Sequence, residues 1–427
     1  MRTTGVRISR ATMAGLAGCL LVLAACGQGG SGAKTQASLQ IVPVVAPLAT
    51  TLVTPAGSWA VIAMGDLSER TNTFWQLFFR APGGSHWSLV TPPGVADNGG
   101  LVITAEPSGR LTAGIEPSQL LKFSPLASST NGGRTWGAGV VPVGLSLFPD
   151  ALATGAGGAL LALVRAHDGQ VLSGGGGSLA WGSVLTGAEL ASLPAGQSCG
   201  VGELTAVASV APDSSAGGGA PAAGTIDGAA GVVGASCQRN GVVGVFVRSA
   251  GTWDRVGPTL TGALAKTPTK VLALSSAAPG SAAGSAPSSA PGHAQSGLVA
   301  GGTSSSEAVA AFWASSPRGP YSVSPPLSLG SRGSLVSSGV ANGDESWVLV
   351  SHSAGPLVLD TITPGTSWRQ TPDLPSGTAT VLIRPGGKLD ALAVTRTKFS
   401  DWALDASNGS WRKLQTIAVP INYGSSA

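Results

Sequence analysis

The chain is poor in ionisable side chains, which limits the chemistry it can perform. Charged residues make up 10% of its 427 residues, and it has four histidines and two tyrosines. Few groups are therefore available for acid–base catalysis, and no two histidines have the spacing of metal ligands. We predict no metal site and no cofactor. The histidines are His86, His167, His293 and His352.

The chain also lacks a clear surplus of charge. Lys plus Arg total 24 against 20 Asp plus Glu, but Arg2, Arg7 and Arg10 lie at the very start, which leaves 21 basic against 20 acidic residues in the remainder. A nucleic-acid-binding protein needs a basic surface that neutralises phosphates. We therefore predict no nucleic-acid partner.

Long apolar runs are absent after residue 25. None reaches the roughly 18 residues that a membrane span requires. Residues 1–25 combine early arginines, an apolar stretch and small residues at the end, a pattern typical of an export signal. The string Leu23-Ala24-Ala25-Cys26 resembles the lipobox of bacterial lipoproteins. The resemblance implies cleavage before Cys26, a lipid on its sulfur and a membrane-anchored, extracytoplasmic protein. The alternative is an ordinary cleaved signal with an incidental cysteine.

After the signal we expect three segments: a flexible Gly/Ser-rich tether over residues 26–38, a folded domain over 39–421 and a tail over 422–427.

Of the four cysteines, Cys19 leaves with the signal and Cys26 carries the lipid. Cys199 and Cys237 remain, and in an oxidising compartment we expect them to form a disulfide. A metal site is the alternative, but no second pair of ligands lies nearby in the sequence.

Past residue 38 the pattern predicts an all-β domain. Short β-rich runs alternate with Gly, Pro, Ser and Asn turns, and no run has convincing helical periodicity. Seven turns end in an aromatic residue, at intervals of 49, 45, 72, 68, 47 and 43 residues. These aromatics are Trp87, Trp136, Trp181, Trp253, Tyr321, Trp368 and Trp411.

The two long intervals contain low-complexity insertions at 212–231 and 277–297, each after the first strand of its repeat. Without them every interval lies between 43 and 52 residues, the length of one four-stranded propeller blade. We therefore predict a seven-bladed β-propeller of four-stranded blades. Six or eight blades, or an array of two-sheet sandwiches, are the alternatives. In the last repeat we expect strands at 378–384, 389–397, 399–406 and 411–418.

One aromatic-ended turn has a specific resemblance. The turn from Ser129 to Trp136 resembles the Asp-box, or bacterial neuraminidase repeat, with Asn131 at the position of the acid. The resemblance implies a sialidase-like propeller in which the box is scaffold on the periphery of a blade. The residues that match it are Ser129, Asn131, Gly133, Thr135 and Trp136.

The catalytic pattern of the sialidases is missing. Their nucleophile is a tyrosine, whereas Tyr321 occupies a turn position and Tyr423 lies in the tail. A glycosidase with two carboxylates stays open, because acids could approach in pairs across the central funnel. The acids considered are Asp97, Glu106, Glu116, Asp168, Glu203, Glu307, Asp344, Glu345, Asp360 and Asp390.

Two further groups of residues are candidates for recognition. The aromatics could either fill the space between sheets or stack on a ligand in the funnel. Four arginines recur near strand ends, and we expect most to be solvated. The aromatics are Phe74, Trp75, Phe78, Phe79, Phe312 and Trp313, and the arginines are Arg80, Arg165, Arg248 and Arg396.

Together these features favour a non-catalytic, envelope-anchored propeller that binds a protein, peptide or glycan outside the cytoplasm. The alternative is a glycoside hydrolase or lyase acting on extracellular polysaccharide. The identity of the ligand and the ligand-binding residues stay open. A funnel lined by small side chains would favour the binder, and clustered carboxylates with arginines would favour the enzyme.

Overall fold

The computed structural model describes one compact unit, Leu39–Ala427, within which residues 48–420 are described except for short stretches. No helix in this described part is long and apolar enough to cross a membrane. The leader, Cys26 and the tether lie outside it. The internal stretches left out are 68–72, 93–97, 107, 118–125, 138–144, 146–147, 155–158, 166–168, 176–179, 210–230, 250, 277–294, 304–305, 331–332, 342–344, 354, 372 and 385.

The unit is nearly all β, as predicted, and its strands form consecutive antiparallel groups. We number these groups in chain order. Group 1 contains β1 (Ala49–Thr54), β2 (Gly57–Gly65), β3 (Thr73–Arg80) and β4 (Trp87–Leu89); group 2 contains β5 (Asn98–Ala105), β6 (Leu111–Pro117) and β7 (Leu126–Ser129); group 3 contains β8 (Ala151–Thr154), β9 (Ala159–Val164), β10 (Gln170–Gly175) and β11 (Trp181–Thr186).

The remaining groups follow the same order. Group 4 contains β12 (Val201–Ser209), β13 (Gly231–Cys237), β14 (Gly244–Ser249) and β15 (Thr252–Arg255); group 5 contains β16 (Thr269–Ser276), β17 (Gln295–Thr303), β18 (Ser306–Ala314), β19 (Tyr321–Val323) and β20 (Leu327–Ser328); group 6 contains β21 (Gly333–Ala341), β22 (Glu345–His352), β23 (Val358–Ile362) and β24 (Arg369–Thr371); group 7 contains β25 (Thr378–Arg384), β26 (Lys388–Val394), β27 (Lys398–Asp405) and β28 (Ser410–Ala418).

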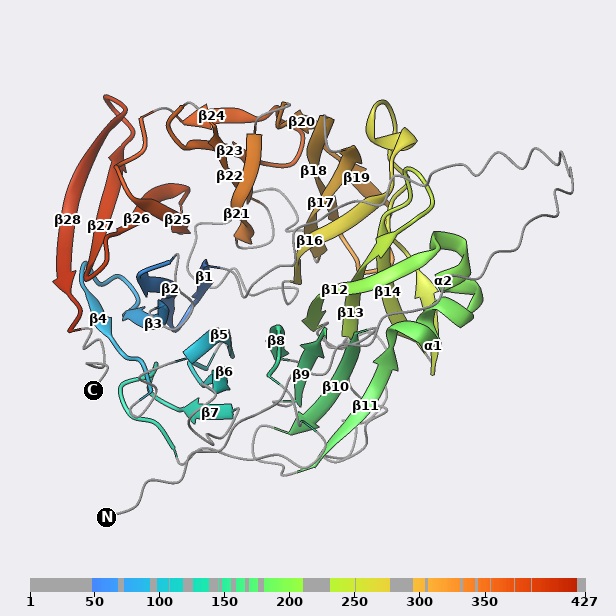
Figure 1. Ribbon diagram of the computed structural model, residues 1–427, viewed down its shortest axis with the longest axis horizontal. Helices are drawn as coiled ribbons and strands as arrows, with labels where there is room; N and C mark the ends of the chain where they lie inside the picture. Colours follow the sequence, from blue (N-terminus) through green and yellow to red (C-terminus); the bar gives the residue numbers. More distant parts are fainter. Residues whose placement is uncertain are drawn as a thin grey trace, which may run out of the picture. The chain divides into compact units, whose positions relative to one another are not determined.

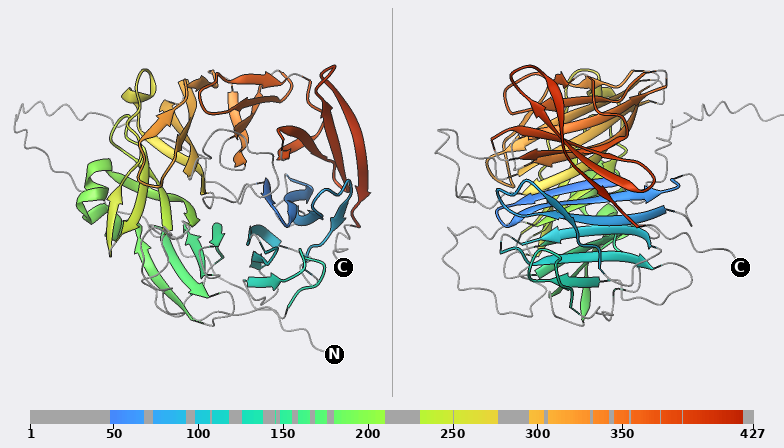
Figure 2. Two further views of the ribbon diagram at one scale, coloured as in Figure 1. Left: turned by 180° about the vertical axis from the view of Figure 1, so that it is seen from behind. Right: turned by 90° about the vertical axis from the view of Figure 1, so that its left-hand side faces the viewer.

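The groups follow one another around a ring, with the first strand of each group innermost (Figure 1). Each innermost strand contacts the next, from β1 through β5, β8, β12, β16 and β21 to β25, and β25 contacts β1. The view from behind shows the same succession (Figure 2). This arrangement of twisted sheets around a centre is that of a β-propeller.

Buried apolar side chains fill the seams between neighbouring groups, and β2 shows how the sequence produces this packing. Successive side chains of a strand point to opposite faces. Trp59 and Val61 of β2 therefore pack with residues of group 2, whereas Ile62 and Met64 pack with residues of group 7. Both faces of the strand are covered, which explains why β2 is buried throughout and apolar from Trp59 to Met64.

Groups 4 and 5 are joined more closely than the others. Strand β13 pairs with β16 at two positions, Ser236 with Lys270 and Cys237 with Thr269, so the two groups share one hydrogen-bonded sheet. The strand β12 lies beside β13 in the same sheet. A backbone connection of this kind adds hydrogen bonds to the apolar packing of the seam.

Two short helices were not predicted. Helix α1 (Gly187–Ser192) and helix α2 (Pro194–Cys199) connect β11 to β12. The Thr186 hydroxyl accepts from the Glu189 amide, and the Glu189 carboxylate accepts from the Thr186 amide, which is a capping box. The box was readable in the sequence, but six-residue helices are too short to show apolar periodicity.

The strands expected in the last repeat agree with β25 to β28 within one to three residues at their ends. Two expected insertion boundaries need correction, because Gly231 opens β13 and residues 295–297 open β17. The side chains of Gln295 and Ser296 are fully buried. Small and polar residues in these strands resemble low-complexity sequence, which is why the boundaries were placed too late.

Six of the seven aromatic-ended turns precede outermost strands. Trp87, Trp181 and Tyr321 open β4, β11 and β19. Trp253 and Trp411 are second in β15 and β28, and Trp368 directly precedes β24. Trp136 follows β7, and the description of group 2 contains no fourth strand.

Candidate functional site

Cys26 lies outside the described residues, so its lipidation stays a prediction. The predicted pair Cys199 and Cys237 does form a disulfide, with the two Cα atoms 5.1 Å apart and both side chains fully buried. Because Cys199 ends α2 and Cys237 ends β13, the bond fixes the two short helices against group 4.

Side-chain hydrogen bonds hold the turn that resembles an Asp-box. The Ser129 hydroxyl accepts from the Gly133 amide at 2.8 Å, and the Asn131 side-chain oxygen accepts from the Thr135 amide at 2.9 Å. The Trp136 indole donates to the Val90 carbonyl at 2.8 Å, which ties the turn to group 1. These contacts are those of a scaffold, and the Asp-box assignment itself stays a prediction.

Of the two alternatives for the aromatic residues, the structure supports packing between sheets. All six candidate rings are at most 6% exposed and pack between or within sheets. Arg80 departs from the expectation of solvated arginines, because it is 2% exposed. Arg396 agrees with it, since it forms an ion pair with Asp66 at the surface. Tyr321 lies on the outermost strand β19, where its hydroxyl donates to Gln295 and burial raises its pKa.

The described innermost strands carry mainly Ala, Gly, Ser, Thr, Val and Leu, with three charged residues. Lys270 of β16 and Glu203 of β12 form an ion pair of 3.9 Å, and Arg384 ends β25. Burial lowers the pKa of Lys270, and Glu203 opposes this effect.

The candidate carboxylates do not assemble around the ring centre in the part of the chain that is described. Asp390 does approach a second acid, but that acid is Asp401 and both lie in the seam between groups 7 and 1. Burial raises the pKa of Glu307, Glu345 and Asp360, which lie in separate places. No cluster of three or more metal-ligating side chains occurs among the described residues. Asp97, Asp168, Asp344, His167 and His293 and the side chain of Glu116 lie outside the description.

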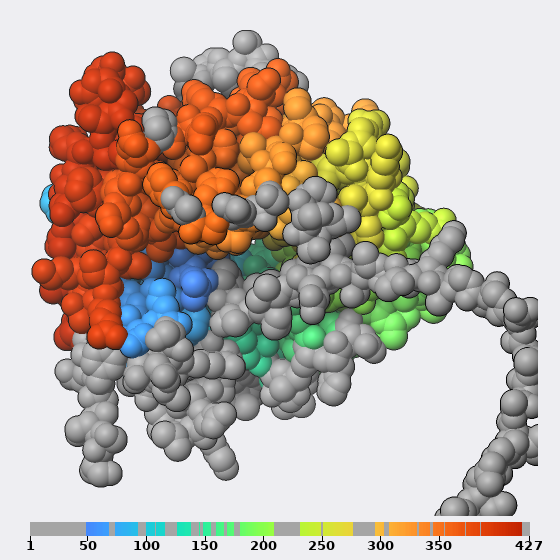
Figure 3. Space-filling view, turned by 45° about the horizontal axis from the view of Figure 1, so that its top comes forward, coloured from blue at the N-terminus to red at the C-terminus, as the bar shows by residue number. Residues whose placement is uncertain are grey.

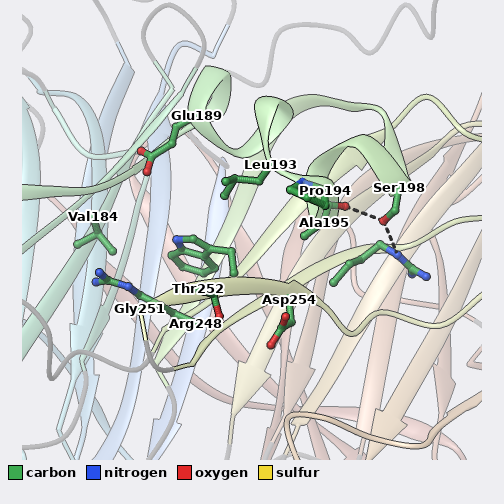
Figure 4. A pocket seen from close by; sticks show the side chains of 12 residues that line it. Val184, Glu189, Leu193, Pro194, Ala195, Ser198, Arg248, Gly251, Thr252 and Asp254 are labelled. Carbon is green, nitrogen blue, oxygen red and sulfur yellow. Dashed lines mark hydrogen bonds between the residues drawn. The ribbon is translucent and has the colours of Figure 1, made fainter.

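A groove of about 700 Å³ on the outer side of groups 3 and 4 is a candidate site. One wall comes from α1 and α2, and the other from β14 and β15 (Figure 4). Leu193, Pro194 and Ala195 of the helical wall face the strand wall with Thr252 and Asp254. The remaining lining residues are Val184, Glu189, Ser198, Arg248, Gly251, Trp253 and Arg255.

The groove combines an apolar interior with charges of both signs. Trp253 and Val184 are largely buried within it. Arg255 is held in place because its Nε donates to the Ser198 hydroxyl at 3.2 Å and its Nη1 donates to the Gly257 carbonyl at 2.7 Å. Burial lowers the pKa of Arg255, although an arginine stays charged in proteins. Such a surface can bind apolar and charged groups of one ligand together.

No pattern in the sequence indicated that these residues form a groove. Arg248 was considered because of its place near a strand end, and Trp253 because of its repeat position. The disulfide was predicted, but not its role in holding one wall. The helices that make that wall were missed, so the residues they contribute could not be assembled in advance.

Comparison with known proteins gives structural likenesses of low similarity. No family model and no curated protein sequence matches the chain. Similar solved structures include a proposed 6-phosphogluconolactonase from Bacteroides fragilis NCTC 9343, with 11% identity, 86% of this chain and 97% of that chain covered and a TM-score of 0.47. The periplasmic gluconolactonase PpgL of Pseudomonas aeruginosa has 13% identity, coverages of 85% and 96% and a TM-score of 0.45.

The β-propeller domain of the Trilobed protease from Pyrococcus furiosus has 8% identity, coverages of 87% and 97% and a TM-score of 0.43. With TM-scores below 0.5, none of these likenesses carries an argument about the activity of this chain. The site must be interpreted from its own residues.

Proposed function

We propose that the chain is a lipid-anchored, extracytoplasmic β-propeller with seven blades that binds a peptide segment in the groove between α1–α2 and β14–β15. Seven buried apolar clusters, one at each seam between consecutive groups, support the blade count. The lipobox-like string at Cys26 supports the anchor. The sialidase-like turn at residues 129–136 is scaffold in this proposal.

The groove itself carries the proposal for binding. A peptide offers apolar side chains, charges of both signs and backbone donors and acceptors within one short segment. The groove offers an apolar interior with Trp253, acidic Glu189 and Asp254, and the fixed guanidinium of Arg255. A disulfide and a capping box hold the helical wall, so little ordering entropy is lost when a ligand binds.

Binding by the groove is tested with a variant that fills it. Thr252 is exposed and lines the groove, so Thr252→Trp places a bulky ring there. Peptides selected from a random display library on the Cys26→Ser chain should bind this variant at least tenfold more weakly. Ser88→Trp is the matched control, because Ser88 is an exposed residue of the outer strand β4, away from the groove.

Equal binding of the selected peptides to both tryptophan variants would contradict the proposal that the groove is the binding site. A glycan array probed with the same proteins distinguishes the other ligand class. If the protein binds a glycan but no peptide, and Thr252→Trp loses the glycan binding, the groove is the binding site but its ligand is not a peptide.

The anchor is tested separately. Cys26→Ser should move the protein from the detergent phase to the aqueous phase and leave the domain folded, because the lipid is the anchor that the sequence offers. Retention of the Ser variant in the detergent phase would contradict the lipoprotein assignment.

A further inference from the structure

The ring closes where groups 1 and 7, the two ends of the described chain, lie side by side (Figure 3). Phe78 of β3 stacks on Phe399 of β27 with ring centroids 4.1 Å apart, and Trp87 meets Phe399 edge-on at 5.7 Å. The Thr51 hydroxyl of β1 donates to the Val381 carbonyl of β25 at 3.0 Å. No strand of group 1 pairs with a strand of group 7 among the described residues. In the same part of the chain one backbone hydrogen bond crosses the seam, from the Gly65 amide to the Arg396 carbonyl at 3.0 Å, and side chains make the other described contacts.

A buried ionic cluster lies at the centre of the seam. Arg80 Nη1 donates to Asp390 Oδ2 at 2.8 Å and to Asp401 Oδ2 at 3.3 Å. Arg384 Nη2 donates to Asp390 Oδ1 at 2.7 Å, and the Trp87 indole donates to Asp401 Oδ2 at 3.0 Å. The Arg80 guanidinium lies over the Trp87 ring at 4.6 Å. We call these five residues the closing cluster.

The two aspartates of the closing cluster are unequally compensated. They lie on neighbouring strands, because Asp390 pairs with Ala403 and Asp401 with Leu392, which makes the aspartates diagonal neighbours on one face. Both side chains are fully buried. Asp390 contacts two guanidinium groups, whereas Asp401 shares one of them at the longer distance. Asp401 Oδ1 has no hydrogen-bond partner in the structure.

We propose that the closing cluster is a proton-linked latch, in which Asp401 takes up a proton in mild acid and the first and last sheets are then held together more firmly. A second buried carboxylate that is poorly paired is costly when ionised. A proton on Asp401 removes that charge, while Asp390 keeps both of its arginines. The device lies outside the binding groove and does not depend on the proposed function.

The environment of Asp401 determines whether its pKa is raised or lowered, and therefore how stability depends on pH. Burial and the adjacent Asp390 carboxylate raise the pKa of Asp401 from 3.8 to about 6, against the opposing effects of Arg80, Trp87 and Arg384. On β28, Gln415 is uncharged and contacts Trp87, and the Lys413 ammonium lies over the Trp402 ring. Because the pKa is higher in the folded state, the stabilising effect is complete below pH 3.8 and is lost as the pH rises through 6.

The test compares unfolding of the full chain by denaturant at pH 5.0 and 7.5. From pKa values of 3.8 unfolded and about 6 folded, the unfolding equilibrium constant should rise about tenfold through Asp401 alone. Asp401→Asn keeps an oxygen that accepts from Arg80 and Trp87 but does not titrate. The unfolding equilibrium constant of this variant should therefore lack the rise of about tenfold between pH 5.0 and 7.5. Asp405→Asn is the control, because Asp405 is exposed on the same strand and should behave as wild type.

A wild-type readout covers the case in which Asp401→Asn does not fold. The Trp87 indole N–H donates to Asp401, so its NMR resonance should titrate with a midpoint near pH 6 in the unaltered chain. Trp87→Phe assigns that resonance. Absence of any midpoint between pH 5 and 7.5, or the same pH dependence of unfolding in wild type and Asp401→Asn, would overturn the proposal.

Discussion

Two seams of the ring are built differently. Groups 4 and 5 share a hydrogen-bonded sheet through the pairing of β13 with β16, and an apolar cluster with Val271, Val299 and Phe312 fills the space between them. Groups 7 and 1 have no such pairing among the described residues, and a buried ionic cluster lies between their aromatic rings. One seam is joined by paired strands, whereas the other has, in the described part of the chain, a single backbone hydrogen bond, from the Gly65 amide to the Arg396 carbonyl, and is held mainly by side chains.

The difference follows from chain connectivity. Consecutive groups are linked covalently, so apolar packing and short backbone bridges suffice to keep them in register. Groups 7 and 1 are hundreds of residues apart in sequence, and bringing them together costs loop-closure entropy. Directional contacts such as those of Arg80 fix the register of this long-range contact. A buried charge network of this kind favours one arrangement even where its net energy is small.

The largest loss of stability is expected from Arg80→Ala, which removes the central cation of the closing seam. The change leaves Asp390 and Asp401 buried with their main counter-ion removed, and breaking a buried pair in this way costs about 3 to 5 kcal/mol. Chemical denaturation at pH 7 measures it. Arg318→Ala, which removes an exposed ion pair with Asp254, should cost at most about 1 kcal/mol. A similar loss of unfolding free energy in both variants would show that the closing cluster stabilises the fold no more than an exposed ion pair does.

A somewhat smaller loss of stability is expected when the disulfide that fixes α2 against group 4 is removed. The double change Cys199→Ser and Cys237→Ser removes a cross-link over 38 residues, which stabilises by about 2 to 4 kcal/mol. It also frees α2, so peptide binding in the groove should weaken together with stability. Unchanged binding in a destabilised variant would separate the groove from the disulfide.

The smallest loss of stability is expected at the turn after β7, which packs against group 1. Trp136 is half-buried, so Trp136→Ala should cost about 2 kcal/mol, below the cost for a fully buried indole. Asn131→Asp should be within about 0.5 kcal/mol of wild type, since the carboxylate accepts from the same Thr135 amide, and the Thr135 hydroxyl, which accepts from Asn131 in the wild type, can donate to the second carboxylate oxygen. Denaturation of both variants measures this. A larger cost for Asn131→Asp than for Trp136→Ala would contradict the scaffold role of the turn.

Local patterns predicted much of the fold. The turns before aromatic residues and the alternating runs located the strands of group 7, and β25 has the expected bounds of 378–384. The small helices were missed because six residues carry no periodicity. The insertion boundaries were misplaced because Gln295, Ser296 and Gly297 resemble linker sequence, although they begin a buried strand.

The closing cluster could not be predicted in the same way. Arg80 lies 310 residues from Asp390 and 321 from Asp401, and no local pattern connects them. Asp390 was one of several acids considered for the funnel, and most of the four arginines were expected to be solvated, but Asp390 and Arg80 are both buried in the closing seam. The strand positions alone do not give the twist and stagger that bring β3 against β26 and β27.

Native-state hydrogen exchange of the two seams at pH 7.5 tests the central claim most directly. Amides of Phe399 and Trp402 at the closing seam should open at a lower free energy than amides of Val271 and Val299 at the seam of groups 4 and 5. Asp401→Asn should narrow that difference. Equal opening free energies at both seams, unchanged in Asp401→Asn, would contradict the account of a ring closed by a proton-linked side-chain cluster.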